Sequence, residues 1–251
     1  MGILTDGNAN LVLSGLTLYS GTPSAALAVW VRNPAVSAGS DFLRLRNAGT
    51  TTAFGLNAQS NTVLGGSYVA TGGDSAYKTD GNDENSSWKP MMVFAYSSTG
   101  GSTIDRLRFW SGAATTGVED TLGPAKSNNM SLLTVIEAGV GDSADIAEMI
   151  VLTGLDLTAA QTFWTAFKAG ATLPETIDPA HTVTWATLKD MTSGSLTLGN
   201  GLGTLAATGA GTIVASTTAP THPITRTAAG GGGPLNRGLT QSPLTNGRCI
   251  A

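Results

Sequence analysis

The chain is divided into short apolar runs, each long enough for one β-strand and bounded by glycine, proline, asparagine or serine. Apolar and polar residues alternate in two of these runs, 42–46 and 107–109, which predicts strands with one buried face and one wet face. The pattern therefore predicts an all-β fold made of two stacked antiparallel sheets. The principal runs are residues 11–18, 25–32, 42–46, 63–70, 91–96, 104–110, 132–136 and 146–152.

The composition agrees with many tight turns and a neutral surface. Glycine accounts for 33 of the 251 residues, and charged residues for 12% of the chain. Soluble domains usually contain about 7% glycine and about 25% charged residues. A helical bundle is excluded by these proportions, because glycine in helix interiors is destabilising.

One segment is predicted to be helical, at residues 158–169. Thr158 and Gln161 have the spacing of a capping box, and Gly170 is the expected residue after the helix. An aromatic stripe follows the helical period and is expected to pack into the core. The stripe consists of Phe163, Trp164 and Phe167.

The residue pattern of the chain changes after this helix. Short strand candidates separated by glycine turns occur between residues 176 and 218, which predicts a small β-rich segment. This segment forms either a separate domain or the completion of the main sandwich at 1–175. Residues 219–251 lose all periodicity and are rich in glycine and proline, which predicts an extended or flexible C-terminal arm.

Charge and hydropathy exclude several classes of function. The net charge is −4 and no basic cluster occurs, so binding to nucleic-acid phosphates is not expected. No apolar stretch reaches the ~18 residues that span a bilayer, and the N-terminus lacks the pattern of a signal peptide. The single cysteine, Cys249, excludes an intrachain disulfide.

Three blocks carry a resemblance to a known family: residues 28–34 (AVWVRNP), the hairpin candidate 88–112, and 145–170, where an apolar strand precedes the helix. Their order and spacing resemble the laminin-G-like branch of the concanavalin A-like lectin/glucanase jelly rolls, over roughly residues 10–175. The resemblance implies a jelly-roll β-sandwich for residues 1–175. It implies no particular activity, because this fold carries lectins, hydrolases and structural modules.

Residues for catalysis are sparse. Glycosidases of this fold use a Glu-x-Asp-x-x-Glu strand, and here Asp145 and Glu148 match its second half while Ser143 replaces the nucleophile. The histidines, His181 and His222, are not accompanied by a nucleophile elbow. The sequence thus predicts a protein that is not an enzyme and requires no cofactor.

One loop is rich in the oxygen ligands that Ca²⁺ prefers. Asp80, Asn82 and Asp83 lie within residues 74–85, although the spacing departs from an EF-hand. These residues predict a calcium site, with a solvated hairpin tip as the alternative.

Glycan-binding sites often stack sugar rings on exposed aromatic side chains. Four aromatic residues outside the expected core are candidates for this role, with ordinary packing as the alternative. They are Tyr68, Tyr77, Trp110 and Trp185.

These features lead to the hypothesis that the chain is a structural virion protein. Its overall residue pattern also resembles that of bacteriophage virion proteins that carry this module. It would be a capsid decoration, head-fibre or tail-appendage protein, assembled in the host cytoplasm. We expect a homo-oligomer, a trimer or dimer, with capsid or tail proteins as partners. The alternative is a lectin-like adhesion module that binds host surface glycans, and a hydrolase with an unrecognised site is the third hypothesis.

Overall fold

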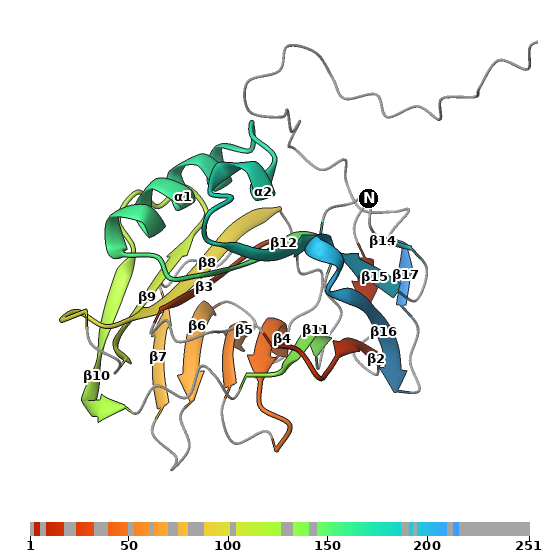
Figure 1. Ribbon diagram of the computed structural model, residues 1–251, viewed down its shortest axis with the longest axis horizontal. Helices are drawn as coiled ribbons and strands as arrows, with labels where there is room; N and C mark the ends of the chain where they lie inside the picture. The colour runs from red at the N-terminus through yellow and green to blue at the C-terminus, as the bar shows by residue number, and fades with distance from the viewer. Residues whose placement is uncertain are drawn as a thin grey trace, which may run out of the picture.

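A computed structural model of the chain describes most residues of the predicted sandwich. Two α-helices, a short 3-10 helix (Gly199–Gly201) and a series of strands are present, and the strands form two layers of sheet with the α-helices on one side (Figure 1). The described residues are 3–5, 9–17, 24–32, 40–49, 53–60, 63–69, 75–79, 88–100, 104–126, 133–140, 145–186, 191–192, 195–209 and 213–215.

The first sheet, sheet A, has eight antiparallel strands. Its hydrogen-bonded order is β10-β9-β8-β3-β12-β1-β17, and β13 also pairs with β12. The strands are β1 (Ile3–Thr5), β3 (Ala25–Arg32), β8 (Lys89–Tyr96), β9 (Ile104–Ser111), β10 (Val118–Lys126), β12 (Asp145–Thr153), β13 (Thr182–Ala186) and β17 (Ile213–Ala215).

The second sheet, sheet B, has nine strands in the order β14-β15-β16-β2-β11-β4-β5-β6-β7. The predicted runs 11–18, 42–46 and 63–70 overlap β2, β4 and β6, and the run 132–136 overlaps only the start of β11, whereas β5, β7 and β14 were not predicted. The strands are β2 (Ala9–Leu13), β4 (Ser40–Arg46), β5 (Ala53–Ser60), β6 (Val63–Val69), β7 (Ser75–Thr79), β11 (Val135–Val140), β14 (Met191–Thr192), β15 (Ser195–Leu198) and β16 (Gly203–Gly209).

The main core lies between the two sheets, so the predicted two-layer sandwich is confirmed. Leu27, Val93 and Phe109 of sheet A face Phe54 and Leu56 of sheet B, and all five are fully buried. The ends of the sheets approach each other, because β10 contacts β7 and β14 contacts β17. Edge strands that cover one another are protected from pairing with other chains.

The sheets approach each other closely at Gly66 on β6. A Cβ atom at this position would lie 2.7 Å from Val93 Cβ and 3.3 Å from Phe109 Cδ2. The absence of a side chain therefore lets the facing strands of sheet A pack directly on the backbone of β6.

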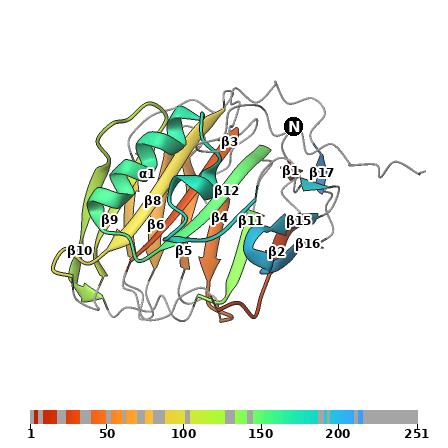
Figure 2. The same ribbon diagram turned by 45° about the horizontal axis from the view of Figure 1, so that its top comes forward.

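A second core lies between the outer face of sheet A and helix α1 (Leu157–Ala169), which lies alongside β8 in Figure 2. Ala28, Met92 and Ile150 of the sheet pack with the helix. The aromatic stripe of α1 is fully or almost fully buried, as predicted: Phe163, Trp164 and Phe167.

The predicted capping box of Thr158 and Gln161 is wrong. Asp156 caps α1, because its Oδ1 accepts a hydrogen bond from Ala159 N at 2.7 Å. Thr158 already lies within the first turn. The end of the helix is as predicted, since Gly170 has a φ of 74°, a left-handed conformation that favours glycine.

The strands after α1 are hydrogen-bonded into the same two sheets. A second helix, α2 (Pro174–Ile177), was not predicted and begins with proline, which suits a first helical turn. Strand β13 then pairs with β12, β16 pairs with β2, and β17 pairs with β1. The predicted arm at 219–251 lies outside the described residues.

Candidate functional site

The outer face of sheet B carries a charged cluster, cluster B, formed by Asp41, Arg44, Arg46 and Glu137. Arg44 and Arg46 alternate along β4 with the buried Leu43 and Leu45, so both arginines point away from the core. The strand register places Glu137 of β11 directly opposite Arg44. The alternation thus assembles charges from two strands on one surface.

The contacts within cluster B are short and directional. Glu137 binds both arginines: its Oε2 accepts from Arg44 Nε at 2.5 Å, and its Oε1 accepts from Arg46 Nη2 at 2.7 Å. Arg44 Nη1 also donates to Asp41 Oδ2 at 2.7 Å. In the described part of the chain these contacts use Arg44 Nε and Nη1, which leaves Nη2 as a donor for another molecule.

The pKa values of the two carboxyl groups in cluster B are shifted in opposite directions. Burial opposes ionisation of Glu137, but the hydrogen bonds and charges of Arg46 and Arg44 outweigh burial and lower its pKa. Burial dominates at Asp41 and raises its pKa, although Arg44 and Asn57 favour the ionised form. Glu137 is therefore held as an anion, while Asp41 carries a cost of desolvation.

Small and amide residues border cluster B on the neighbouring strands. A Cβ atom at Gly55 would lie 2.9 Å from Arg44 Cβ, so glycine gives the Arg44 side chain room across β5. Asn57 Nδ2 donates to Ser67 Oγ at 3.0 Å. Asn57 Oδ1 is buried without a hydrogen-bond partner in the described residues. The cluster is therefore continuous with a polar strip over β5 and β6.

A corresponding cluster, cluster A, lies on the outer face of sheet A beside α1 and consists of Tyr96, Asp105, Arg106, Arg108 and Glu119. It repeats the arginine-leucine-arginine pattern of β4, with Leu107 buried between the two arginines. The strand register places Glu119 of β10 opposite Arg108. Both sheets thus present a carboxylate held by arginines.

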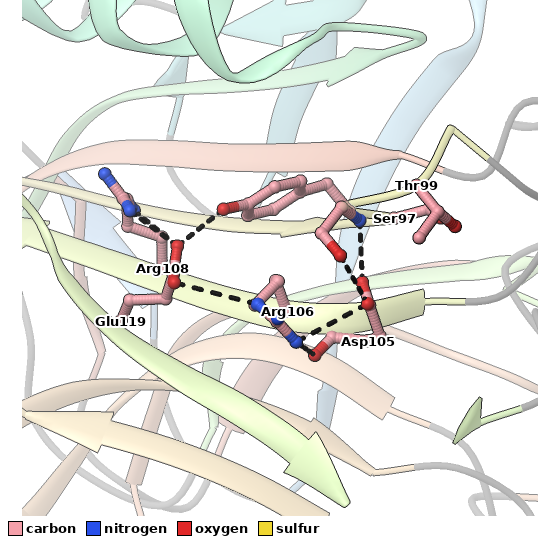
Figure 3. A network of polar contacts seen from close by, with 8 residues as sticks. Ser97, Thr99, Asp105, Arg106, Arg108 and Glu119 are labelled. Atoms are coloured by element: carbon pink, nitrogen blue, oxygen red, sulfur yellow. Dashed lines mark hydrogen bonds and ion pairs between the residues drawn. The ribbon is translucent and has the colours of Figure 1, made fainter. Parts of the chain in front are cut away.

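Glu119 is the centre of cluster A (Figure 3). Its Oε2 accepts from Tyr96 Oη at 2.5 Å and from Arg108 Nη2 at 2.5 Å. Arg106 Nε lies 3.7 Å from Glu119 Oε1, and Arg106 Nη1 lies 3.4 Å from Asp105 Oδ2. Figure 3 shows the two arginines turned toward these acids.

The contacts of cluster A determine the ionisation of its members. Burial and the hydrogen bond to Glu119 raise the pKa of Tyr96 to about 12, so the phenol stays a donor at neutral pH. Burial opposes ionisation of Glu119, but Tyr96 and Arg108 outweigh burial and lower its pKa. Tyr96 is consequently fixed at the end of β8, where Phe94 stacks on its ring at 4.7 Å between centroids.

Next to cluster A is a cleft of about 500 Å³. It lies between the start of the β8–β9 connection and the loop that leads from β12 into α1. Its size falls within the range of small-molecule sites, about 300–1,000 Å³. The lining residues are Ser24, Tyr96, Ser97, Ser98, Gly100, Gly154, Leu155, Asp156 and Leu157.

The predicted aromatic candidates do not form one site. Tyr68 and Trp110 are fully buried, Tyr68 between the sheets and Trp110 beside Trp164 of α1. A buried ring offers no face to a sugar, so these two predictions are corrected. Tyr68 is turned toward the core between the sheets, whereas Trp110 is on the outer face of sheet A and is buried there with α1 in the second core.

The other two aromatic candidates are Trp185 and Tyr77. Trp185 on β13 is half-buried, and its ring lies against Gly199, where a Cβ atom would be only 2.7 Å from Cζ2. Tyr77 lies on β7, opposite Ser67, and its side chain is outside the described part. Asp80, Asn82 and Asp83, the predicted calcium ligands, also lie outside the described residues.

The described residues contain neither a cluster of metal ligands nor a membrane-spanning helix. No group of three or more histidine, cysteine, aspartate or glutamate residues in this part of the chain could hold a metal ion. No helix within the described ranges has the length and apolar character needed to cross a bilayer.

Sequence reasoning missed both charged clusters. Its one usable signal was the arginine-leucine-arginine pattern, which occurs at 44–46 and again at 106–108 and predicted a wet strand face. The partners Glu137 and Glu119 are supplied by other strands, at positions that only the register defines.

Comparisons with known proteins define the fold. No protein-family model matches the sequence, and no curated protein matches it. Full-length tailspike protein 2 of Escherichia coli O157:H7 bacteriophage CAB120 is 11% identical with a TM-score of 0.50, over 76% of this chain and 27% of the tailspike chain.

Two further solved structures are similar. Domains LG4-5 of the mouse laminin α1 chain are 12% identical with a TM-score of 0.45, over 60% of this chain and 41% of that chain. A pentraxin from Limulus polyphemus is 10% identical with a TM-score of 0.46, over 64% of this chain and 79% of that chain. This chain thus spans less than half the length of the laminin and tailspike chains. Together with the two stacked antiparallel sheets, the likeness to the tailspike, at a TM-score of 0.50, shows that the chain adopts the predicted jelly-roll β-sandwich fold.

Proposed function

We propose that the chain is a carbohydrate-binding module, not an enzyme, which presents the outer face of sheet B to a glycan. The observation that carries the proposal is cluster B, a rigid set of charged donors and acceptors on a sheet face. Both described helices lie on the opposite side of the sandwich, against sheet A (Figure 2). Charged groups that are already fixed make strong, directional hydrogen bonds to hydroxyl groups.

The charge of cluster B favours an uncharged glycan. Two arginines are balanced by Asp41 and Glu137, so the surface offers hydrogen bonds without a net field. Arg44 Nη2 is available as a donor, and Asp41 supplies carboxylate oxygens beside it. A sugar with neighbouring hydroxyl groups can accept from the first and donate to the second.

The same geometry argues against hydrolysis. Arg44 contacts both acids, through Nε to Glu137 and through Nη1 to Asp41. Glu137 accepts hydrogen bonds at both of its oxygens, so it is poorly placed to attack an anomeric carbon. The pair therefore suits binding better than acid–base catalysis.

A glycan array with the purified chain tests this proposal. We expect binding to neutral oligosaccharides that falls at least about tenfold in Arg44→Ala, because a charge-assisted hydrogen bond contributes about 1.5–3 kcal/mol. Arg44→Lys keeps the charge beside Glu137 and should bind at an intermediate level. Arg106→Ala is the matched control, since its side chain is 27% exposed and that of Arg44 is 26% exposed.

Three outcomes would overturn the proposal. These are an array without any signal, a signal that Arg44→Ala leaves unchanged in a folded protein, and turnover of a polysaccharide by the chain. Thermal melts of each variant separate loss of binding from loss of folding.

A specific observation favours a second proposal, that the module belongs to a bacteriophage appendage and acts in the virion. It is supported by the structural likeness to a phage tailspike protein over 76% of this chain. The small fraction of charged residues, 12% of the chain, is compatible with a subunit packed in an assembly.

For the second proposal we expect the purified 251-residue chain to form a trimer or dimer. Native mass spectrometry and light scattering measure this directly. A chain that stays monomeric at every concentration tested would contradict self-assembly.

A further inference from the structure

We propose that the cleft beside cluster A is a second ligand site, which takes a single uncharged sugar residue. It lies on the sheet A side of the molecule, whereas cluster B lies on the outer face of sheet B. The proposal does not depend on glycan binding at cluster B. If both sites bind, the chain can link two sugars across the sandwich.

The first argument is that the walls of the cleft are fixed in advance. Tyr96 is held between the Phe94 ring and Glu119, to which its hydroxyl donates. Ser98 is held by Asp105, which accepts from Ser98 N at 2.7 Å and from Ser98 Oγ at 2.6 Å. A site whose side chains are ordered before binding loses less conformational entropy when the ligand enters.

The second argument is the mixture of surfaces that line the cleft. Leu157 is half-buried and, with the small exposed parts of Tyr96 and Leu155, contributes apolar surface that suits the carbon–hydrogen face of a pyranose. Hydroxyl groups lie beside this surface: Ser24 Oγ donates to Leu155 O at 2.7 Å, and its lone pairs remain able to accept. A sugar residue presents the same combination of an apolar face and a polar rim.

The third argument concerns charge. Among the described residues that line the cleft, Asp156 is the only ionisable side chain apart from the phenol of Tyr96, which is neutral at pH 7. Asp156 Oδ1 accepts from Ala159 N, so Oδ2 is left to accept from a ligand hydroxyl. Arg106 and Arg108 do not line the cleft and are engaged by Asp105 and Glu119. The lining therefore disfavours an anion and lacks the paired acids that would hold a cation.

Nuclear magnetic resonance titration with methyl α-D-glucopyranoside tests the site. For a ligand of this size we expect a Kd of roughly 1–10 mM. We expect saturable shifts at the backbone amides of Ser98, Leu155 and Leu157. D-glucuronate, the anionic counterpart, should shift these amides less at equal concentration.

Two variants report on the cleft. Ser97→Trp fills it and should abolish the titration. Asp156→Asn retains an N-cap of about equal quality and should weaken binding several-fold through loss of the carboxylate. Arg44→Ala should leave these shifts unchanged, which separates this site from cluster B.

A neighbouring cleft of about 420 Å³ shares Asp156 and supplies the matched control. Thr162→Trp fills that second cleft and should leave binding unaffected. The proposal is overturned if no uncharged methyl glycoside shifts the three amides, if folded Asp156→Asn binds as tightly as the native chain, or if Thr162→Trp abolishes binding.

Discussion

Replacing Trp164 with alanine is expected to lower the free energy of unfolding by about 3–5 kcal/mol, the range for removing a large buried aromatic side chain. Trp164 is fully buried between α1 and the outer face of sheet A. Its ring lies 6.4 Å from that of Trp110, and its Nε1 donates to Ala114 O at 2.7 Å. Alanine would leave a cavity in the second core, which is measurable by chemical denaturation.

Trp164→Phe is the control for this prediction. It keeps an aromatic ring in the layer and loses the indole hydrogen bond. Ala114 O would still accept from Lys168 Nζ at 2.8 Å, so the carbonyl stays satisfied. The phenylalanine variant should therefore lose less than half of what alanine loses. A loss below about 1 kcal/mol for Trp164→Ala would contradict the packing of α1 on the sheet.

Most of the sandwich was predictable because its central strands carry dense apolar runs. Strand β8 is buried at every position, and β3 at all but its last. Such strands are flanked on one side by the sheet–sheet core and on the other by α1, so their sequences read as continuous apolar segments. The predicted run at 132–136 overlaps β11 only in part, because Glu137 interrupts its apolar pattern.

The strands that were not predicted lack this density for identifiable reasons. On β5, Gly55 and Asn57 occupy the outer face, where they border Arg44 and Ser67. β10 contains Pro124, which is tolerated because β10 ends sheet A and has an edge that needs no donor. These residues fit the outer surface and the sheet edge, positions that exist only once the sheet is assembled.

The candidate site was less predictable than the fold. The sequence pattern predicted exposed aromatic rings as sugar-binding residues, but two of the four candidates, Trp110 and Tyr68, are buried. The wet strand faces expected from the alternation are confirmed at Arg44 and Arg108. The acidic partner of each arginine depends on strand pairing. Arg44 and Glu137 are 93 positions apart in the sequence, and Arg108 and Glu119 are 11 positions apart.

Cluster B gives the second large effect. Glu137→Gln is expected to destabilise the protein by about 2–3 kcal/mol, somewhat below the 3–5 kcal/mol for breaking a fully buried pair. The side chain of Glu137 is 4% exposed, whereas Arg44 and Arg46 are 26% and 17% exposed and keep part of their hydration. The variant leaves two arginines facing a neutral amide. Denaturant titration at neutral pH measures the loss.

Asp41→Asn is the matched control and should not lower the free energy of unfolding as Glu137→Gln does. Burial raises the pKa of Asp41, so its ionised form is less favourable in the folded chain than in the unfolded chain. Asparagine removes that cost and its carbonyl oxygen can still accept from Arg44. The free energy of unfolding should therefore stay within about 0.5 kcal/mol of the native value or rise.

The pH dependence separates the two acids further. Because the folded-state pKa of Glu137 lies below its ordinary value of 4.5, its contribution is complete above pH 4.5 and is lost as pH falls through the folded-state pKa. The difference between the native chain and Glu137→Gln should thus narrow on acidification. At Asp41 the folded-state pKa lies above the ordinary 3.8, so its unfavourable contribution fades as pH falls through that range. A Glu137→Gln deficit that persists undiminished in acid would mean that packing, and not the charge held by the two arginines, makes Glu137 necessary.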